Sequence, residues 1–96
     1  GACGTAYAMR YIRANIQGGI EIGFDAATAS LIAAQTVKGA AELLLQKGTH
    51  PEQEIDKVTT PKGCTIAGLN EMEHQGFSSS LIRGITVSFN KIIKAG

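Results

Sequence analysis

The sequence is poor in charge. Only 18% of its 96 residues are charged, and the formal net charge at pH 7 is +1. A net charge this close to zero gives no electrostatic basis for binding nucleic acid or an anionic membrane. Long apolar runs are also missing, because Gln35, Lys38 and Glu42 interrupt the longest candidate for a membrane span. We therefore expect neither a nucleic-acid partner nor a membrane.

Cysteine is scarce as well. Cys3 and Cys64 lie far apart and form no CxxC pattern, and only His50 and His74 could join them as soft or imidazole ligands. We therefore expect no metal site. Two lone thiols fit a reducing compartment, which predicts a cytoplasmic protein, although the sequence leaves a single disulfide between them open.

Small apolar residues, alanine above all, supply much of the 44% hydrophobic content. Their spacing predicts an all-α fold of about five helices and no strand. The chain is long enough for one domain with a modest core. Its start, Gly1-Ala2-Cys3-Gly4, lacks a methionine and a signal peptide, so we expect one domain cut from a longer protein.

Cap and turn residues predict the helix ends. The first helix is expected from about Thr5, its cap, to Gln17, with Gly18-Gly19 ending it. The expected bounds of the others are as follows: Asp25 as N-cap to Gly48; Pro51 to Lys57 or Val58; a fourth helix with Ile66, Leu69 and Met72 on one face that stops at Gly76; and a fifth with Ser78 as N-cap and Phe77 and Ile82 as a hydrophobic staple.

The second predicted helix has an apolar surface wider than one face. Ala29, Ala33 and Val37 recur at helical spacing, and Leu31 and Leu45 broaden the surface. A surface helix of a small monomer shows a narrower stripe. We interpret this helix as central, covered on one side by its own chain and on another by a second subunit. A monomeric five-helix bundle is the alternative.

The loop before the fourth helix is the strongest candidate for a binding site. The first amides of a helix lack intrahelical partners, and the helix dipole adds positive charge, so such a start can hold a carboxylate or phosphate. An ordinary cap made by Thr60 or Thr65 is the alternative. Two registers are open: Thr60 caps and Pro61 is the first helical residue, or the helix begins after Gly63. No histidine or carboxylate is placed beside a reactive serine or cysteine, so a hydrolase triad is not expected.

The same residues carry a resemblance to a known family. The run Thr60–Leu69, followed by Glu73 and Gly76-Phe77, is similar to the signature of pyrroline-5-carboxylate reductase, Ser-Pro-Gly-Gly-x-Thr-Ile-x-Gly-Leu with Leu-Glu and Gly-Phe after it. Further matches lie upstream: Cys3-Gly4-Thr5-Ala6-Tyr7, Ala33-Ala34-Gln35-Thr36 with Gly39-Ala40-Ala41, His50-Pro51, and Asp56-x-Val58-Thr59. The resemblance covers essentially the whole chain.

The resemblance implies a fold and an activity. Residues 1–96 would be the helical dimerisation and substrate-binding domain, an interlocked homodimer that can assemble further. The family reduces 1-pyrroline-5-carboxylate to L-proline with NADPH or NADH, the last step of proline biosynthesis. The cofactor is bound mainly by an N-terminal dinucleotide-binding domain that is absent from this chain, so its contacts here are unknown and the fragment alone is expected to be inactive. No Gly-x-Gly-x-x-Gly occurs in the sequence.

The resemblance also assigns the site residues. The substrate carboxylate would lie on the amides of Gly63, Cys64 and Thr65, with Thr60 also binding substrate. Thr65 would be the catalytic residue, because its hydroxyl would bond to the imine nitrogen and position it or help to protonate it. The alternative function is a non-catalytic helical oligomerisation module.

Three positions depart from the family pattern. Thr60 replaces a serine, Thr5 replaces a proline, and Lys62 replaces a glycine. A left-handed backbone at Lys62 would carry a steric penalty, because lysine has a Cβ and the glycine of the family pattern has none. The departures leave Gly63 and Thr65 in place.

Overall fold

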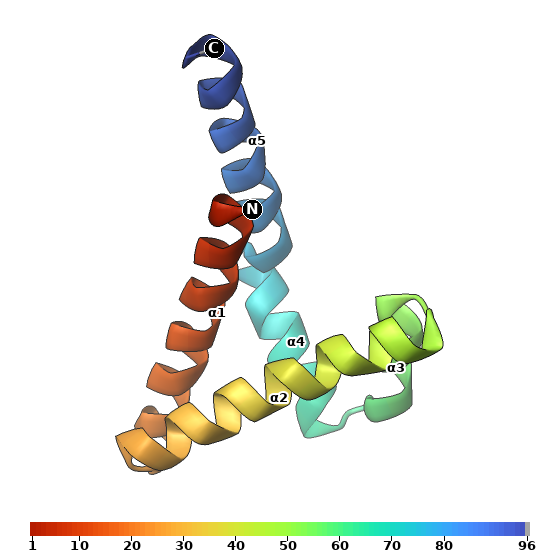
Figure 1. Ribbon diagram of the computed structural model, residues 1–96. Coiled ribbons are helices and arrows are strands. Elements are labelled where there is room, and N and C mark those ends of the chain that lie inside the picture. Colours follow the sequence, from red (N-terminus) through yellow and green to blue (C-terminus); the bar gives the residue numbers. More distant parts are fainter. Residues whose placement is uncertain (96) are drawn as a thin grey trace. The chain divides into compact units, whose positions relative to one another are not determined.

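The computed structural model describes residues 1–95, which form five α-helices and no strand (Figure 1). The all-α prediction is therefore confirmed for this part of the chain. The helices are α1 (Ala2–Glu21), α2 (Ala26–Lys47), α3 (Pro51–Val58), α4 (Cys64–His74) and α5 (Phe77–Ala95). They divide into two compact units, Gly1–Pro51 and the chain from Glu52 onward. No helix within the described residues is long and apolar enough to cross a membrane.

The first unit is a pair of helices, α1 and α2, that meet at one end (Figure 1). Their contact is made by small residues. Ala29 and Ala33 are 3% and 1% exposed, and a Cβ added at Gly19 would lie 3.2 Å from the Cβ of Ala29. Small side chains at these positions let the two helix axes approach closely.

The ends of α1 differ from the prediction. The helix begins at Ala2 after Gly1, and the Thr5 hydroxyl donates to the Gly1 carbonyl (3.1 Å) instead of capping. Gly18 and Gly19 lie inside the helix, and Gly19 leaves room there for Ala29. The positive φ that ends the turn belongs instead to Gly23 (φ 118°).

The ends of α2 are as predicted. The Asp25 carboxylate accepts hydrogen bonds from the amide (2.8 Å) and the hydroxyl (2.9 Å) of Thr28. These bonds hold the pKa of the Asp25 carboxyl below its ordinary value. At the other end Gly48 adopts the left-handed conformation, and its amide donates to the Leu44 carbonyl. The α2 side that faces α1 is buried, whereas Leu31 and Leu45 stay 63% and 80% exposed.

In the second part of the chain both ends of α3 are as predicted, and α4 follows one of its two predicted registers. Helix α3 runs over Pro51–Val58 as expected, and α4 begins after Gly63. Helix α4 ends at His74 with Gln75 as its C-cap, and so stops just before Gly76, as predicted. However, α5 begins at Phe77, so the prediction of Ser78 as its N-cap is wrong. Gly76 takes up the bend with a φ of 91°, and its carbonyl accepts the first α5 amide bond, from Ser80 (2.8 Å).

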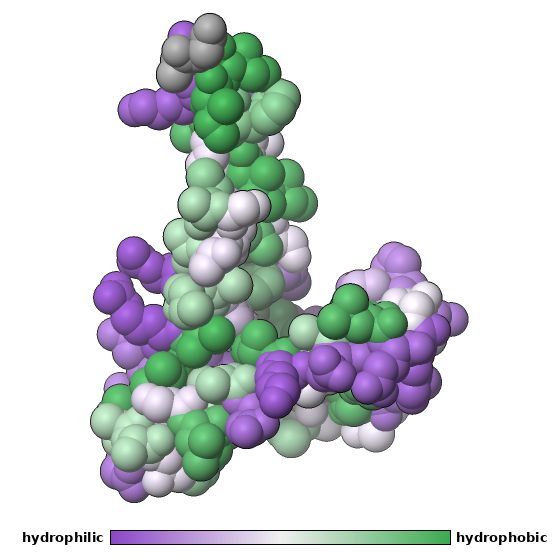
Figure 2. Space-filling model, in the orientation of Figure 1, coloured by the Kyte–Doolittle hydropathy of each residue, from purple (hydrophilic) through white to green (hydrophobic). Residues whose placement is uncertain are grey.

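Large apolar side chains are mostly uncovered. On α5 they gather on one side of the helix and are between 45% and 65% exposed: Leu81, Ile82, Ile85, Phe89, Ile92 and Ile93. Figure 2 shows this apolar strip along α5. Ala29 and Ala33 are the buried apolar residues of the described chain. One copy of the chain therefore lacks the core that a domain of this size needs.

The Asp25 cap predicts a pH dependence of stability. Because the folded pKa is lowered, the stabilisation is complete above the ordinary carboxyl pKa of about 4 and is lost as the pH falls through the folded value. We expect the unfolding free energy of Asp25→Ala to fall less than that of the unmodified protein on acidification. Urea titrations at one fixed protein concentration measure this, with Glu21→Ala as a control that removes a carboxylate from outside the cap. Equal acid sensitivity of the unmodified protein and Asp25→Ala would contradict the assignment.

Candidate functional site

The candidate site begins with a tight turn over residues 60–63. The Gly63 amide donates to the Thr60 carbonyl (2.9 Å), and Lys62 has a φ of 62°. Proline at the second position and a positive φ at the third are the pattern of a type II turn. Lys62 is the non-glycine residue with positive φ in the described chain. The expected left-handed backbone at Lys62 is therefore present, and its Cβ brings a steric cost of about 1 kcal/mol.

Gly63 is favoured by the crowding around it rather than by its backbone angles. It adopts an extended conformation (φ −77°, ψ 169°), which any residue can take. A Cβ at this position, however, would lie 2.5 Å from the Thr60 hydroxyl oxygen and 3.1 Å from the Thr60 carbonyl oxygen. The glycine thus allows the close approach of Thr60, a residue of its own chain.

The start of α4 settles the register that the sequence left open. Gly63 is the N-cap, Cys64 is the first helical residue, and the first i to i−4 bond runs from the Ala67 amide to the Gly63 carbonyl (3.2 Å). The alternative start, with Thr60 as cap, is wrong. No side chain caps this helix, so neither Thr60 nor Thr65 acts as an ordinary cap.

This register corrects the expected set of amides. The Gly63 amide is occupied by the Thr60 carbonyl and cannot also hold a ligand. The amides of Cys64 and Thr65 lie in the first turn, where a helix offers no internal acceptor, and Ile66 follows them in the same turn. The Ile66 amide was not among the expected amides, because its place in the first turn depends on which register the helix adopts. The anion-binding geometry of the prediction thus keeps two of its three amides.

The side chains around this start are accessible. Thr60, Cys64 and Thr65 are exposed, and Gly63 is half-buried. The Thr59 hydroxyl donates to the Ile55 carbonyl (3.1 Å), which ties the entrance of the turn to the last turn of α3. The open face of the α4 start can therefore receive a small anion through backbone donors and one hydroxyl, that of Thr65.

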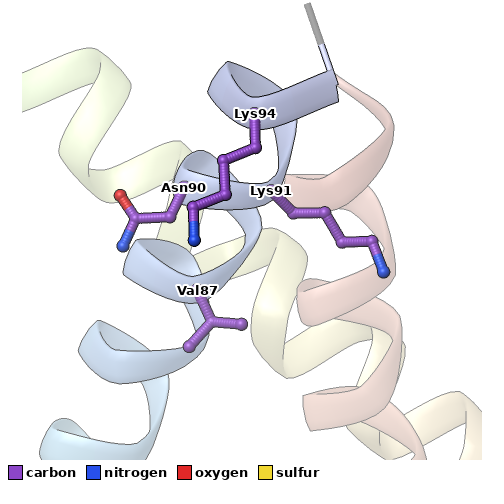
Figure 3. A pocket seen from close by; sticks show the side chains of 4 residues that line it. All are labelled: Val87, Asn90, Lys91 and Lys94. Atoms are coloured by element: carbon purple, nitrogen blue, oxygen red, sulfur yellow. The ribbon is translucent and has the colours of Figure 1, made fainter.

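A hollow in the surface lies elsewhere, on α5. Figure 3 shows its lining, which consists of Val87, Asn90, Lys91 and Lys94. All four come from one helix, so the hollow is an open strip of helix surface rather than an enclosed pocket. No group of three or more metal-ligating side chains occurs within residues 1–95, and both cysteines are unpaired thiols.

These features define a class: an all-helical domain whose apolar faces its own chain does not cover, with open amides at one helix start. A family model described as pyrroline-5-carboxylate reductase dimerisation matches residues 1–94. The chain belongs to this family.

Relatives over almost the whole chain carry the same description. Pyrroline-5-carboxylate reductase 1 of Dictyostelium discoideum is 67% identical over 90 residues, which are 94% of this chain and 16% of that protein. Pyrroline-5-carboxylate reductase of Synechocystis sp. is 40% identical over 93 residues, which are 97% of this chain and 35% of that protein. This chain thus spans about a sixth to a third of the length of these relatives.

A solved structure shares the fold. The crystal structure of Plasmodium falciparum pyrroline carboxylate reductase with NADP bound matches with a TM-score of 0.89 and 26% sequence identity. The match covers 94% of this chain and 34% of that one. The helical fold of this chain is therefore also found in that enzyme.

The turn predicts opposite effects of two Gly→Ala substitutions in the same segment. Gly63→Ala forces its Cβ against Thr60 and should destabilise the protein by about 1–3 kcal/mol, the usual cost of overpacking. Gly68→Ala meets no atom within 4 Å of its Cβ inside α4 and should stabilise by about 0.5–1 kcal/mol. Urea unfolding of both variants measures the difference. Equal stability of the two would contradict the proposed role of Gly63.

Proposed function

We propose that this chain is the dimerisation and substrate-binding domain of a pyrroline-5-carboxylate reductase, which reduces 1-pyrroline-5-carboxylate to L-proline with NADPH or NADH. Family membership over residues 1–94 carries this proposal. The open amides of Cys64 and Thr65 supply a physical reason for it, because the substrate carries a carboxylate.

The residues of this chain have defined roles in the proposal. The Cys64 and Thr65 amides hold the substrate carboxylate, each through a charge-assisted hydrogen bond. The Thr65 hydroxyl bonds to the ring nitrogen and so orients the C=N bond. A neutral threonine hydroxyl is a weak acid, so positioning is the role assigned to it, and the proton comes from water or arrives on the substrate. Thr60 builds the turn that presents these groups.

The hydride donor is not held by this chain alone. A dinucleotide-binding unit needs a strand, a glycine-rich turn and a helix, and the described residues contain no strand. The proposal therefore requires a second, dinucleotide-binding domain on the same protein. Cys64 and Thr65 are assigned to the substrate, Thr60 to the turn that presents them, and none of the three to the cofactor.

The exposed apolar strip on α5 has a role in the same proposal. We assign it to contact with a second copy of the chain, which makes the protein a homodimer. The family description names dimerisation, and Leu81, Ile85 and Phe89 stay about half exposed in a single copy. Burial of such side chains yields roughly 1.5–3 kcal/mol each.

Removal of one hydroxyl tests the substrate site. In the full-length protein, Thr65→Ala should lower kcat/KM for 1-pyrroline-5-carboxylate by about 100-fold, because the ring nitrogen loses its fixed partner. Thr65→Ser keeps the hydroxyl and should stay within about tenfold of the unmodified enzyme. Stability should change little, since Thr65 does not cap α4. Unchanged turnover in Thr65→Ala would remove this residue from the mechanism, and no turnover in the unmodified protein would favour a non-catalytic oligomerisation module.

Two substitutions on α5 test the dimer. Ile85 lies in the apolar strip, whereas Val87 lies on the polar side with Asn90, Lys91 and Lys94, and the two are 50% and 55% exposed. Ile85→Asp should shift the protein from dimer toward monomer or unfolded chain, and Val87→Asp should leave the dimer intact. Sedimentation of the chain alone distinguishes twice 10.0 kDa from 10.0 kDa. A stable 10.0 kDa species without substitution would refute the assignment.

A further inference from the structure

The bend between α4 and α5 is only two residues long. Helix α4 ends at His74, and the amides of Gln75 and Gly76 donate to the carbonyls of Glu71 (3.1 Å) and Glu73 (2.9 Å). Gly76 has a φ of 91°, which a residue with a Cβ rarely adopts. Helix α5 follows at once from Phe77 (Figure 1). We call residues 73–78 the elbow.

A side-chain bond crosses the elbow. The Ser78 hydroxyl, on α5, donates to the Glu73 carboxylate, on α4, over 2.7 Å. A bond to a charged acceptor is about twice as strong as one between neutral groups. The neighbouring carboxylate, Glu71, instead accepts from the Gln75 side chain (2.9 Å) and does not reach α5.

Packing within a single copy of the chain leaves the elbow largely open. Met72 and Phe77, the large apolar side chains beside it, are 53% and 44% exposed, and no residue of α4 or of the described α5 side chains is fully buried. The exposed bond between Glu73 and Ser78 is therefore a constraint within the chain on how α4 leaves α5. The resemblance to the family signature includes Glu73 and Gly76, and the proposed site gives neither of them a role.

A small change of angle at the elbow displaces the start of α4, where the proposed substrate site lies. Helix α4 has 11 residues and is about 16 Å long, with the elbow at one end and the open amides of Cys64 and Thr65 at the other. A tilt of about 10° at the elbow moves the far end by about 3 Å. A misplacement of about 1 Å can already cost 100-fold in a reaction that depends on positioning.

We propose that Glu73, acting through Ser78, is a positioning residue that holds the start of α4 at a fixed angle to α5. The inference rests on the proposed function, in which α4 carries the substrate and α5 lies in the dimer. Loss of the bond leaves the carboxylate-binding amides intact and displaces them relative to the reacting partner. The substrate then still binds, but the hydride transfer step slows.

Steady-state kinetics of the full-length protein test the proposal. Glu73→Ala and Ser78→Ala should each lower kcat about tenfold and leave KM within about twofold, and the double variant should be no worse than either single one. Glu73→Gln keeps an acceptor oxygen and should recover most of kcat. With nicotinamide deuterated at the transferred position, the isotope effect on kcat should rise in the Ala variants, which a loss of folded protein would not cause.

Glu71→Ala is the matched control, because it removes a carboxylate from the same helix without touching the bond across the elbow. Its kcat and isotope effect should match those of the unmodified enzyme. The proposal is overturned when Glu73→Ala behaves like Glu71→Ala, or when Glu73→Gln is as slow as Glu73→Ala.

Amide hydrogen exchange separates this inference from the proposed function. In the full-length protein, Glu73→Ala should speed exchange of the Gly76 and Ser80 amides, whereas Glu71→Ala should not. Faster exchange only in Glu73→Ala supports the constraint even if the unmodified protein does not reduce 1-pyrroline-5-carboxylate. Equal exchange in the two variants overturns it whatever the activity.

Discussion

The uncovered apolar surface is the constraint on which the rest of the structure depends. A chain of 96 residues that buries only Ala29 and Ala33 among its described apolar residues gains too little from its own contacts to offset the entropy of ordering five helices. The missing burial has to come from outside these residues, and the family description names dimerisation. Apolar surface is buried within the chain where the small residues of α1 and α2 meet. The apolar strip on α5 can be buried between two chains.

Exposure to solvent explains why the proposed binding site can lie at a helix start. Open amides are stable where water or a ligand can satisfy them, and the α4 start is exposed in the single chain. The turn before this helix start does not depend on burial in a core. It consists of a proline, a lysine with a left-handed backbone, and a glycine close to Thr60. The stability of the domain therefore resides in its apolar faces, and the turn is free to adopt a costly conformation.

Local chemistry decided which helix ends could be read from the sequence. Asp25, Gly48 and Pro51 act within three or four residues of themselves, and all three were placed correctly. Gly18-Gly19 and Ser78 carry equally strong local signals, yet they serve other contacts. Gly19 makes room for Ala29, and the Ser78 hydroxyl turns to Glu73 on another helix. Such contacts depend on partners that spacing along the chain does not reveal.

The candidate site shows the same division. Proline and glycine predicted a helix start near this turn but left two registers open, and the resemblance to the family favoured the one with Gly63, Cys64 and Thr65 at the opening. The sequence could not predict that the Gly63 amide donates to the Thr60 carbonyl, because that bond forms only when Lys62 adopts a positive φ. A lysine at this position favours the turn less than glycine would, and the turn forms nonetheless. The hydrogen bond and the close contact between Thr60 and Gly63 must therefore outweigh a steric cost of about 1 kcal/mol. Since a closed turn leaves Cys64 and Thr65 as the first residues of α4, the same bond that removes one amide from the site is what fixes the other two.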